Sequence, residues 1–245
     1  MQPEINLFGL SIQTFGICLG LSFLAAGWLV ARRLKELDRN VDFAYEMVFA
    51  ALIGGIVGAK LWYLAENGGP LLSGTGLTFY GGLFGGALAV LAWAKHRGEL
   101  DSMLPDIVAP SLALAYAIGR IGCQLAGDGD YGKDWDGPWA MAYPNGTVPI
   151  DTPVHPTPVY EVIAMLAFTW LLWRLRDRYR PGTLIAIYVV GSGLERFLVE
   201  FVRRNSEVAL GLTQPQLIAV AMMLAGSAWL VARRGPLTTR ATRAA

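Results

Sequence analysis

The sequence predicts an all-α membrane protein of seven transmembrane helices, and three observations support that prediction. The chain has 245 residues, of which 54% are hydrophobic and only 16% charged, and this is too apolar for an ordinary soluble domain. Seven long apolar stretches each approach the roughly 20 residues that cross a hydrocarbon core. The basic residues gather in alternate connections between these stretches. We therefore expect a single transmembrane domain over residues 1–245.

The predicted spans follow directly from the apolar stretches. They lie at about residues 9–31, 43–64, 78–94, 104–126, 158–173, 182–202 and 213–232. Many of the 29 glycines fall inside the second and third spans, and small residues three or four apart favour close helix packing in lipid. For the third span a second interpretation stays open, in which Tyr80, Gly81 and Gly82 form a helix start that binds an anion through free N–H groups.

The distribution of Lys and Arg predicts the orientation. Fourteen of the 20 lie in connections on one side: Arg32, Arg33, Lys35, Arg39, Lys95, Arg97, Arg174, Arg176, Arg178, Arg180, Arg233, Arg234, Arg240 and Arg243. The opposite side has Lys133, Arg203 and Arg204. By the positive-inside rule we expect an outer N-terminus and a cytoplasmic C-terminus. The start of the chain lacks a basic region and a small-residue cleavage site, so we expect the first span to be retained.

The longest connection, residues 127–157, is predicted to form an ordered loop on the outer face between helices four and five. It is rich in Gly, Asp, Pro and Trp, and its tryptophans suit the level of the lipid headgroups. Its aspartates lack the twelfth-position Glu and central Gly of an EF-hand loop, so we predict no metal site.

Three cations fall inside apolar segments, where a lone charge costs at least roughly 2.5–3.5 kcal/mol on insertion scales. They are Lys60, Arg120 and Arg196. Arg196 and Glu200 are four residues apart and share a helix face, so they form either a structural ion pair or part of an anion site. A planar guanidinium binds two oxygens of a phosphate, and the abundant phosphate at this depth is a phospholipid headgroup.

Several short motifs, in this order, resemble the prolipoprotein diacylglyceryl transferase family over almost the whole chain. They are NLFGL before the first span, FYGGLFGG in the third, DIVAP at 106–110, GRIG at 119–122, PWAMAYP before His155-Pro156 and Tyr160-Glu161, and the series Arg196, Glu200, Arg203. The resemblance implies an enzyme of the bacterial cytoplasmic (inner) membrane with its active site toward the outer face. It implies transfer of the diacylglyceryl group of phosphatidylglycerol to the thiol of a prolipoprotein lipobox cysteine, with glycerol phosphate released.

The resemblance and the residue chemistry together name the candidate site. The expected catalytic residues are Tyr80, Arg120, Arg196, Glu200, Asp128 and His155. The expected substrate-binding residues are Gly81, Gly82, Gly119, Gly122, Cys123, Tyr160, Glu161 and Arg203. A thiol must become a thiolate before it attacks a carbon atom, and the two arginines would stabilise the departing phosphate. His155 either anchors the loop or accepts the thiol proton.

Five positions depart from the family pattern. Tyr80 replaces the usual His, Cys123 an Asn and Asp128 a Glu, and two Tyr positions appear as Phe8 and Ser192. Tyrosine, with an ordinary pKa near 10, is a poorer base at neutral pH than histidine. Alternative functions are a divergent paralogue with another acceptor or lipid donor, a non-catalytic phospholipid-binding membrane protein, or a small anion transporter. We expect no cofactor, because the transfer needs none. We expect no nucleic-acid partner, because the net charge is +1 and no basic stripe is present. The expected partners are phosphatidylglycerol or a related phospholipid, the lipobox peptide and the bilayer.

Overall fold

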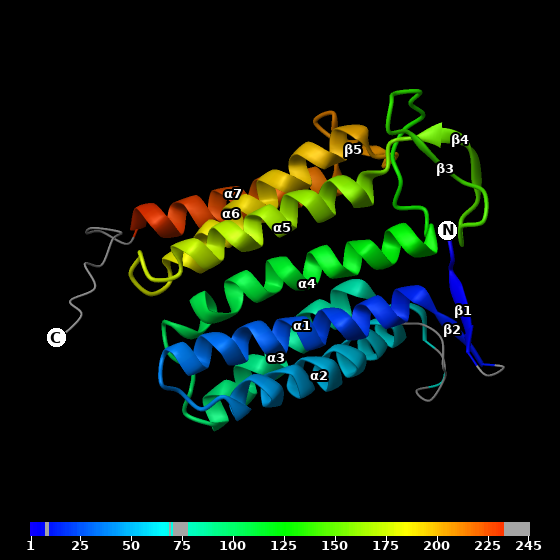
Figure 1. Cartoon of the computed structure of the whole chain (residues 1–245). Coiled ribbons are helices and arrows are strands. Elements are labelled where there is room, and N and C mark those ends of the chain that lie inside the picture. Colours follow the sequence, from blue (N-terminus) through cyan, green and yellow to red (C-terminus); the bar gives the residue numbers. More distant parts are fainter. Residues whose placement is uncertain (8–9, 69, 71–77, 233–245) are drawn as a thin grey trace. The chain divides into compact units, whose positions relative to one another are not determined.

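The computed structural model describes residues 1–7, 10–68, 70 and 78–232, and its main elements are seven α-helices (Figure 1). They are α1 (Thr14–Glu36), α2 (Asp42–Asn67), α3 (Phe79–His96), α4 (Leu104–Ala126), α5 (Thr157–Leu175), α6 (Thr183–Val199) and α7 (Gln214–Ala232). Each predicted apolar stretch overlaps one of them. The sixth stretch divides, because α6 ends at Val199 and a short 3₁₀ helix, η1 (Glu200–Val202), follows.

Three two-stranded antiparallel hairpins accompany the helices. They are β1 (Glu4–Leu7) with β2 (Leu10–Gln13), β3 (Met141–Tyr143) with β4 (Ile150–Val154), and β5 (Glu207–Ala209) with β6 (Leu212–Thr213). The first hairpin explains why α1 begins at Thr14, five residues after the predicted start of the span. Thr14 is held there because its backbone N–H and its hydroxyl both donate to the Pro3 carbonyl, at 2.9 Å each.

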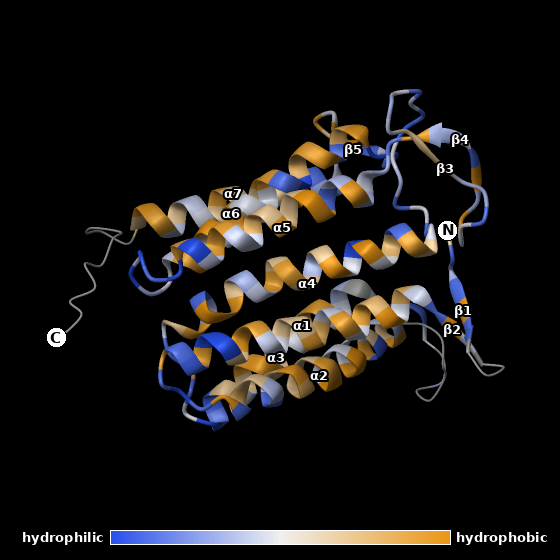
Figure 2. Cartoon of the chain, in the orientation of Figure 1, coloured by the Kyte–Doolittle hydropathy of each residue, from blue (hydrophilic) through white to orange (hydrophobic). Residues whose placement is uncertain are grey.

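Five of these helices, α1, α2, α4, α5 and α7, are long and apolar enough to cross a membrane. Figure 2 shows hydrophobic residues along the helices and hydrophilic ones mainly in the connections. The helix α6 has 17 residues and includes Glu195 and Arg196, and α3 has glycines along its first half and ends at Lys95-His96. Seven spans and an outer N-terminus stay predictions.

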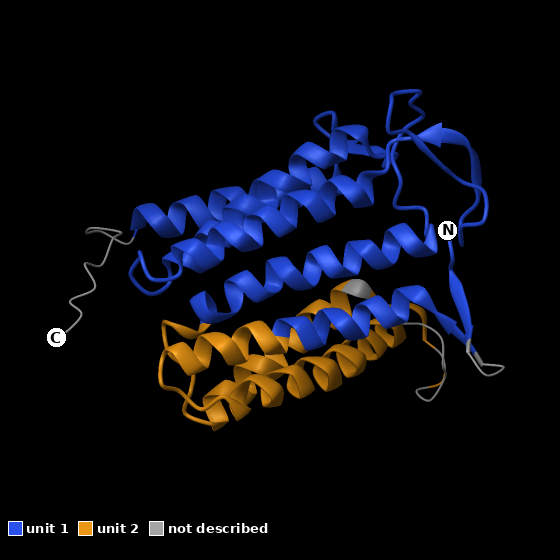
Figure 3. Cartoon of the chain, in the orientation of Figure 1, with its two compact units in different colours: residues 1–26, 105–245 blue, residues 27–104 orange. Residues whose placement is uncertain are grey.

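The chain divides into two compact units, residues 1–26 with 105–245 and residues 27–104 (Figure 3). In the second unit, glycines at a spacing of four let α2 and α3 approach closely. A Cβ on Gly58 would lie 2.4 Å from the Gly81 carbonyl oxygen, and one on Gly54 would lie 2.6 Å from that of Gly85. Helix packing therefore accounts for Gly81, as one of the two interpretations of the third span predicted.

In the first unit, α4, α5 and α6 share a core of small and aliphatic side chains. The buried members are Ala109, Ala113, Ala117, Met165, Leu172 and Leu184. The alanines are four residues apart and face one side of α4, so that side chains of α5 and α6 can pack on it. A second small core, Tyr131, Tyr143 and Val154, lies inside residues 127–157 and shows that this connection has its own packing.

Gly119 and Gly122, which both precede the end of α4, differ in their surroundings. A Cβ on Gly122 would lie 2.9 Å from the Cβ of Cys18 in α1, whereas nothing lies within 4 Å of one on Gly119. We predict that Gly122→Ala lowers the free energy of unfolding by about 1–3 kcal/mol through overpacking. Gly119→Ala, the matched control, should preserve or raise it, as measured by unfolding in detergent. Equal losses in both variants would contradict this packing.

Candidate active site

Three arginines and three carboxylates meet near the ends of α4, α5 and α6, and we call them the arginine–carboxylate cluster. The members are Arg120, Asp130, Glu161, Arg196, Glu200 and Arg203. All of them belong to the first compact unit. Five were predicted as site residues from the sequence, and the structure brings these five together.

Glu161 lies at the centre of the cluster, and its side chain is completely buried. Its Oε2 is 2.9 Å from Arg120 Nε, and its Oε1 accepts a hydrogen bond from Arg196 Nη1 at 3.2 Å. The Tyr116 hydroxyl donates to the same Oε1 at 3.0 Å and accepts from Arg120 Nη2 at 3.0 Å. One carboxylate thus holds arginines of two different helices in fixed positions.

Glu200 and Asp130 complete the pairing. Arg196 Nη2 is 3.0 Å from Glu200 Oε2, which confirms the predicted contact between these two side chains. Glu200 Oε1 also accepts hydrogen bonds from the Thr213 hydroxyl at 2.9 Å and from Asn205. Asp130 binds Arg120 through one carboxylate oxygen and Arg203 through the other.

The formal charges of the cluster cancel, because three guanidinium groups face three carboxylates. Buried ions are tolerated when they are paired with opposite charges, so this pairing lowers the cost of placing arginines among apolar residues. A guanidinium has five N–H donors, and those of Arg120 face Asp130, Glu161, Tyr116 and the Cys123 sulfur. The cluster therefore offers oriented donors to an anion without an excess of positive charge.

Cys123 and Asp128 lie beside Arg120. The Cys123 thiol is hydrogen-bonded to the Asp128 carboxylate, and its sulfur is 3.8 Å from Arg120 Nη1. Burial raises the pKa of Asp128, whereas the pKa of Asp130 lies below its ordinary value because Arg120 and Arg203 outweigh the effect of burial. Ligand atoms of Cys123, Asp128 and Asp130 lie within 4.8 Å of one another, but two guanidiniums occupy Asp130 and disfavour a cation there.

His155 and Tyr160 belong to an aromatic group with Trp135 and Trp139. The His155 ring stacks on Trp135, with centroids 4.4 Å apart and planes 10° apart. The Tyr160 hydroxyl accepts a hydrogen bond from Trp139 Nε1 at 2.8 Å and is 3.2 Å from His155 Nδ1. Backbone bonds pair Gly132 and Lys133 with His155. These contacts support the loop-anchoring interpretation of His155.

The titration of His155 should affect stability. Burial lowers the pKa of His155, so the folded protein favours the neutral ring. The neutral His155 ring therefore contributes to stability above the ordinary histidine pKa of about 6.5. That contribution is lost as the pH falls through the lowered pKa of the folded protein. We expect the unfolding midpoint of the wild type to fall more than that of His155→Gln between about pH 8 and about pH 5. Asp128, whose raised pKa makes stability rise as the pH falls, has the same effect in both proteins and cancels in the comparison. Parallel plots of unfolding midpoint against pH for the wild type and His155→Gln would contradict the prediction.

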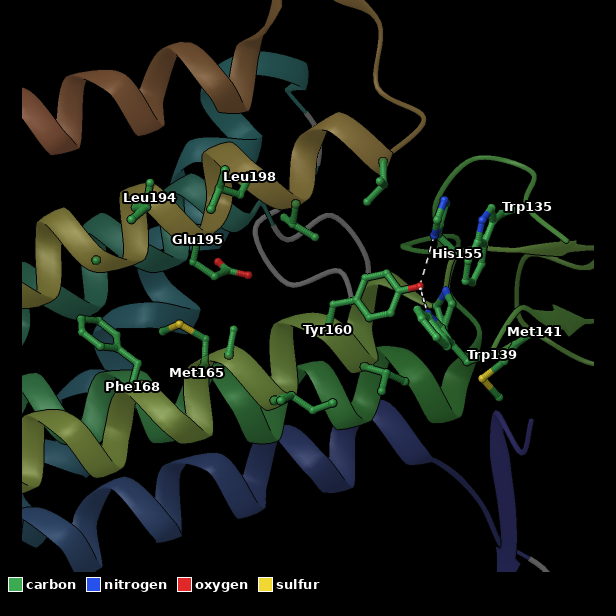
Figure 4. A pocket seen from close by; sticks show the side chains of 17 residues that line it. Trp135, Trp139, Met141, His155, Tyr160, Met165, Phe168, Leu194, Glu195 and Leu198 are labelled. Carbon is green, nitrogen blue, oxygen red and sulfur yellow. Dashed lines mark hydrogen bonds between the residues drawn. The ribbon is translucent and has the colours of Figure 1, made fainter. Parts of the chain in front are cut away.

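An apolar pocket of about 1030 Å³ lies between α5 and α6 (Figure 4). The aromatic group lies at one end and Phe168 at the other, with Gly191 packed against Phe168. Tyr160 of α5 and Glu195 of α6 line this pocket. The residues that follow them in the chain, Glu161 and Arg196, belong to the arginine–carboxylate cluster. Successive helical residues point about 100° apart, so the pocket and the cluster occupy adjoining faces of the same two helices.

Comparison with known proteins identifies the family. The family model for prolipoprotein diacylglyceryl transferase matches residues 3–232. This chain belongs to that family. A phosphatidylglycerol–prolipoprotein diacylglyceryl transferase of Clostridium tetani is 36% identical over 83% of this chain and 86% of its own. A protein of the same name from Pseudomonas paraeruginosa is 33% identical over 94% of both chains, and one numbered 2, from Clostridium perfringens, is 30% identical over 90% and 91%.

Membership of the prolipoprotein diacylglyceryl transferase family makes the chain a transferase, and with its apolar helices a multi-pass membrane protein. The family resemblance read from the sequence is therefore confirmed. The NLFGL motif includes Phe8 and Gly9, which lie outside the described residues.

Tyr80, Gly81 and Gly82, the diacylglyceryl transferase motif of the third span, belong to the second compact unit. The Tyr80 side chain is 42% exposed. Gly81 packs on Gly58, and a Cβ on Gly82 would make ordinary contacts of 3.5 Å with the Gly55 carbonyl and 3.6 Å with Ala59. Their convergence with Arg120 stays a prediction.

Three residues at the candidate site were not predicted from the sequence: Asp130, Tyr116 and Glu195. Asp130 was considered only as one of several loop aspartates, although Arg203 and Arg204, two arginines predicted on the outer face, indicated that counter-charges lie nearby. Tyr116 is four residues before Arg120, so its place on the same helix face was a usable signal. Glu195 carried a signal too, because it is an acidic residue inside an apolar stretch.

Proposed function

We propose that this transferase moves the diacylglyceryl group of phosphatidylglycerol onto the thiol of a lipobox cysteine in the bacterial cytoplasmic membrane. The proposal includes seven spans, an outer N-terminus and a site facing the outer side. The single observation that supports it most is the neutral arginine–carboxylate cluster. In this cluster Glu161 holds Arg120 and Arg196 in position, and their guanidinium N–H groups can donate to a phosphate. The names of the relatives supply the donor and the acceptor class.

The cluster suits a reaction in which a phosphate leaves. The thiolate sulfur forms a bond to the glyceryl carbon while the bond from that carbon to the phosphate oxygen breaks, and the released glycerol phosphate carries the electron pair. Negative charge on the phosphate grows during this step. Preoriented N–H donors in a site that excludes water stabilise such charge most strongly, and they need no reorganisation at the moment of reaction.

The test uses the full chain in phosphatidylglycerol liposomes with a synthetic lipobox peptide. Mass spectrometry should show the peptide heavier by one diacylglyceryl group, with glycerol phosphate released. A peptide with Ser in place of the lipobox Cys is the acceptor control, and phosphatidylethanolamine liposomes are the donor control. A folded protein that binds phosphatidylglycerol but leaves the Cys peptide unchanged would contradict the proposal.

A divergent paralogue is the second candidate, and Tyr80, Cys123 and Asp128 favour it because they replace usual family residues. Tyr80→His distinguishes the two. If the lipobox reaction operates, the histidine should maintain or raise transfer, because its ordinary pKa suits proton transfer near pH 7. If the site serves another acceptor, Tyr80→His should lose the activity toward it and gain none toward the lipobox peptide.

A further inference from the structure

The Glu195 carboxylate, which has no assigned role in the cluster, faces the apolar pocket between α5 and α6 (Figure 4). Among the residues that line the pocket in the described part of the chain, it is the one acidic side chain. No hydrogen bond or ion pair to it is found within residues 1–7, 10–68, 70 and 78–232. Half-buried and beside Arg196, it is nonetheless within electrostatic range of Arg120, Arg196 and Arg203.

The other carboxylates around the arginines are either paired with guanidinium groups or do not line the pocket. Asp130, Glu161 and Glu200 each lie within ion-pair distance of two or more guanidinium groups. Asp128 is of the second kind: it lies beside Cys123 and Arg120 and is not among the residues that line the pocket. His155 has its Nδ1 beside the Tyr160 hydroxyl. Glu195 has free lone pairs and opens onto a pocket wide enough for a substrate segment, with the phosphate-binding face next to it.

We infer that Glu195 is the general base that takes the proton from the acceptor thiol. This inference rests on the proposed function and adds a catalytic residue to it. The carboxylate accepts the thiol proton and becomes a carboxylic acid, and the sulfur, now a thiolate, attacks the glyceryl carbon. The C–O bond to the phosphate breaks, the electron pair leaves on glycerol phosphate held by Arg120 and Arg196, and the proton on Glu195 passes to water.

The apolar surroundings serve this role. Apolar side chains of both helices, among them Ile163, Leu194 and Leu198, line the pocket around Glu195. Few water molecules compete there for the carboxylate, so a thiol that enters the pocket meets a base with little hydration to lose. Transfer of the proton also neutralises the one acidic side chain that lines the pocket in the described part of the chain.

The test compares two acceptor peptides that differ in one atom, lipobox cysteine and lipobox selenocysteine, under reducing conditions. A selenol is ionised at neutral pH and needs no base, whereas a thiol does. Glu195→Gln should slow transfer to the cysteine peptide by about 10²- to 10⁴-fold, the usual contribution of a general base. It should leave transfer to the selenocysteine peptide within about threefold of the wild-type rate.

The ratio of selenocysteine to cysteine rates is the decisive quantity, because loss of folded protein lowers both rates equally. The ratio should rise strongly in Glu195→Gln and less in Glu195→Asp, which retains a base with a shorter reach. Glu207→Gln, on the exposed strand β5, is the matched control and should not change it. An unchanged ratio in Glu195→Gln would overturn the inference. A wild type that modifies neither peptide would contradict the proposed function itself.

Discussion

Arg120→Lys is expected to lower the rate of diacylglyceryl transfer by at least about a hundredfold while the protein stays folded and inserted. Arg120 contacts Asp130, Glu161 and Tyr116 through three different guanidinium nitrogens. Lysine has the same charge but a single nitrogen, so it cannot maintain these contacts and also present donors to a phosphate. The measurement is the transfer rate in liposomes, together with binding of phosphatidylglycerol to the purified variant.

Arg204→Lys is the matched control for this substitution. Arg204 is exposed and binds the Gly132 carbonyl at 2.7 Å and Asp134 at 2.5 Å, outside the arginine–carboxylate cluster. Its replacement should leave the transfer rate near that of the wild type. Wild-type turnover in Arg120→Lys would refute the role of the planar guanidinium in holding the phosphate.

Glu161→Gln is expected to destabilise the fold by about 3–5 kcal/mol, because it leaves buried arginines without their shared counter-charge. Glu161 lies 2.9 Å from Arg120 Nε and 3.2 Å from Arg196 Nη1. The same change should reduce transfer by freeing both arginines to move. Unfolding in mixed detergent and sodium dodecyl sulfate measures the stability, and Glu207→Gln, at an exposed carboxylate, should stay within about 0.5 kcal/mol of the wild type.

A double-mutant cycle separates lost pairing from general damage at this position. Arg196→Gln alone leaves Glu161 and Glu200 each with one guanidinium fewer. When Glu161→Gln and Arg196→Gln are combined, the total destabilisation should be smaller than the sum of the two by about 0.5–3 kcal/mol. Strict additivity would mean that the two side chains do not interact in the membrane.

The sequence was sufficient to predict the helices because membrane spans are long apolar runs, and the bilayer imposes their length. Each of the seven predicted stretches overlaps one helix, and α4 has the predicted bounds. The boundary of α1 was predicted less well, because the β1–β2 hairpin depends on contacts such as those from Thr14 to Pro3 and not on hydrophobicity. Arg120 and Arg196 were also evident, since a charge inside an apolar run is expensive unless function or pairing explains it.

Only the tertiary structure showed how those charges are distributed. From sequence spacing, Arg196 and Glu200 form a pair; in the structure Arg196 also contacts Glu161 on α5, which binds Arg120 on α4. Asp130 comes from the connection after α4 and reaches both Arg120 and Arg203. Helical periodicity relates residues within one helix, whereas partners on different helices depend on how the helices pack and rotate. The sequence by itself therefore determined the family, the helices, and Arg120 and Arg196 as candidate site residues. Tertiary packing decided which carboxylates neutralise these arginines, and it placed Glu195 on the pocket between α5 and α6.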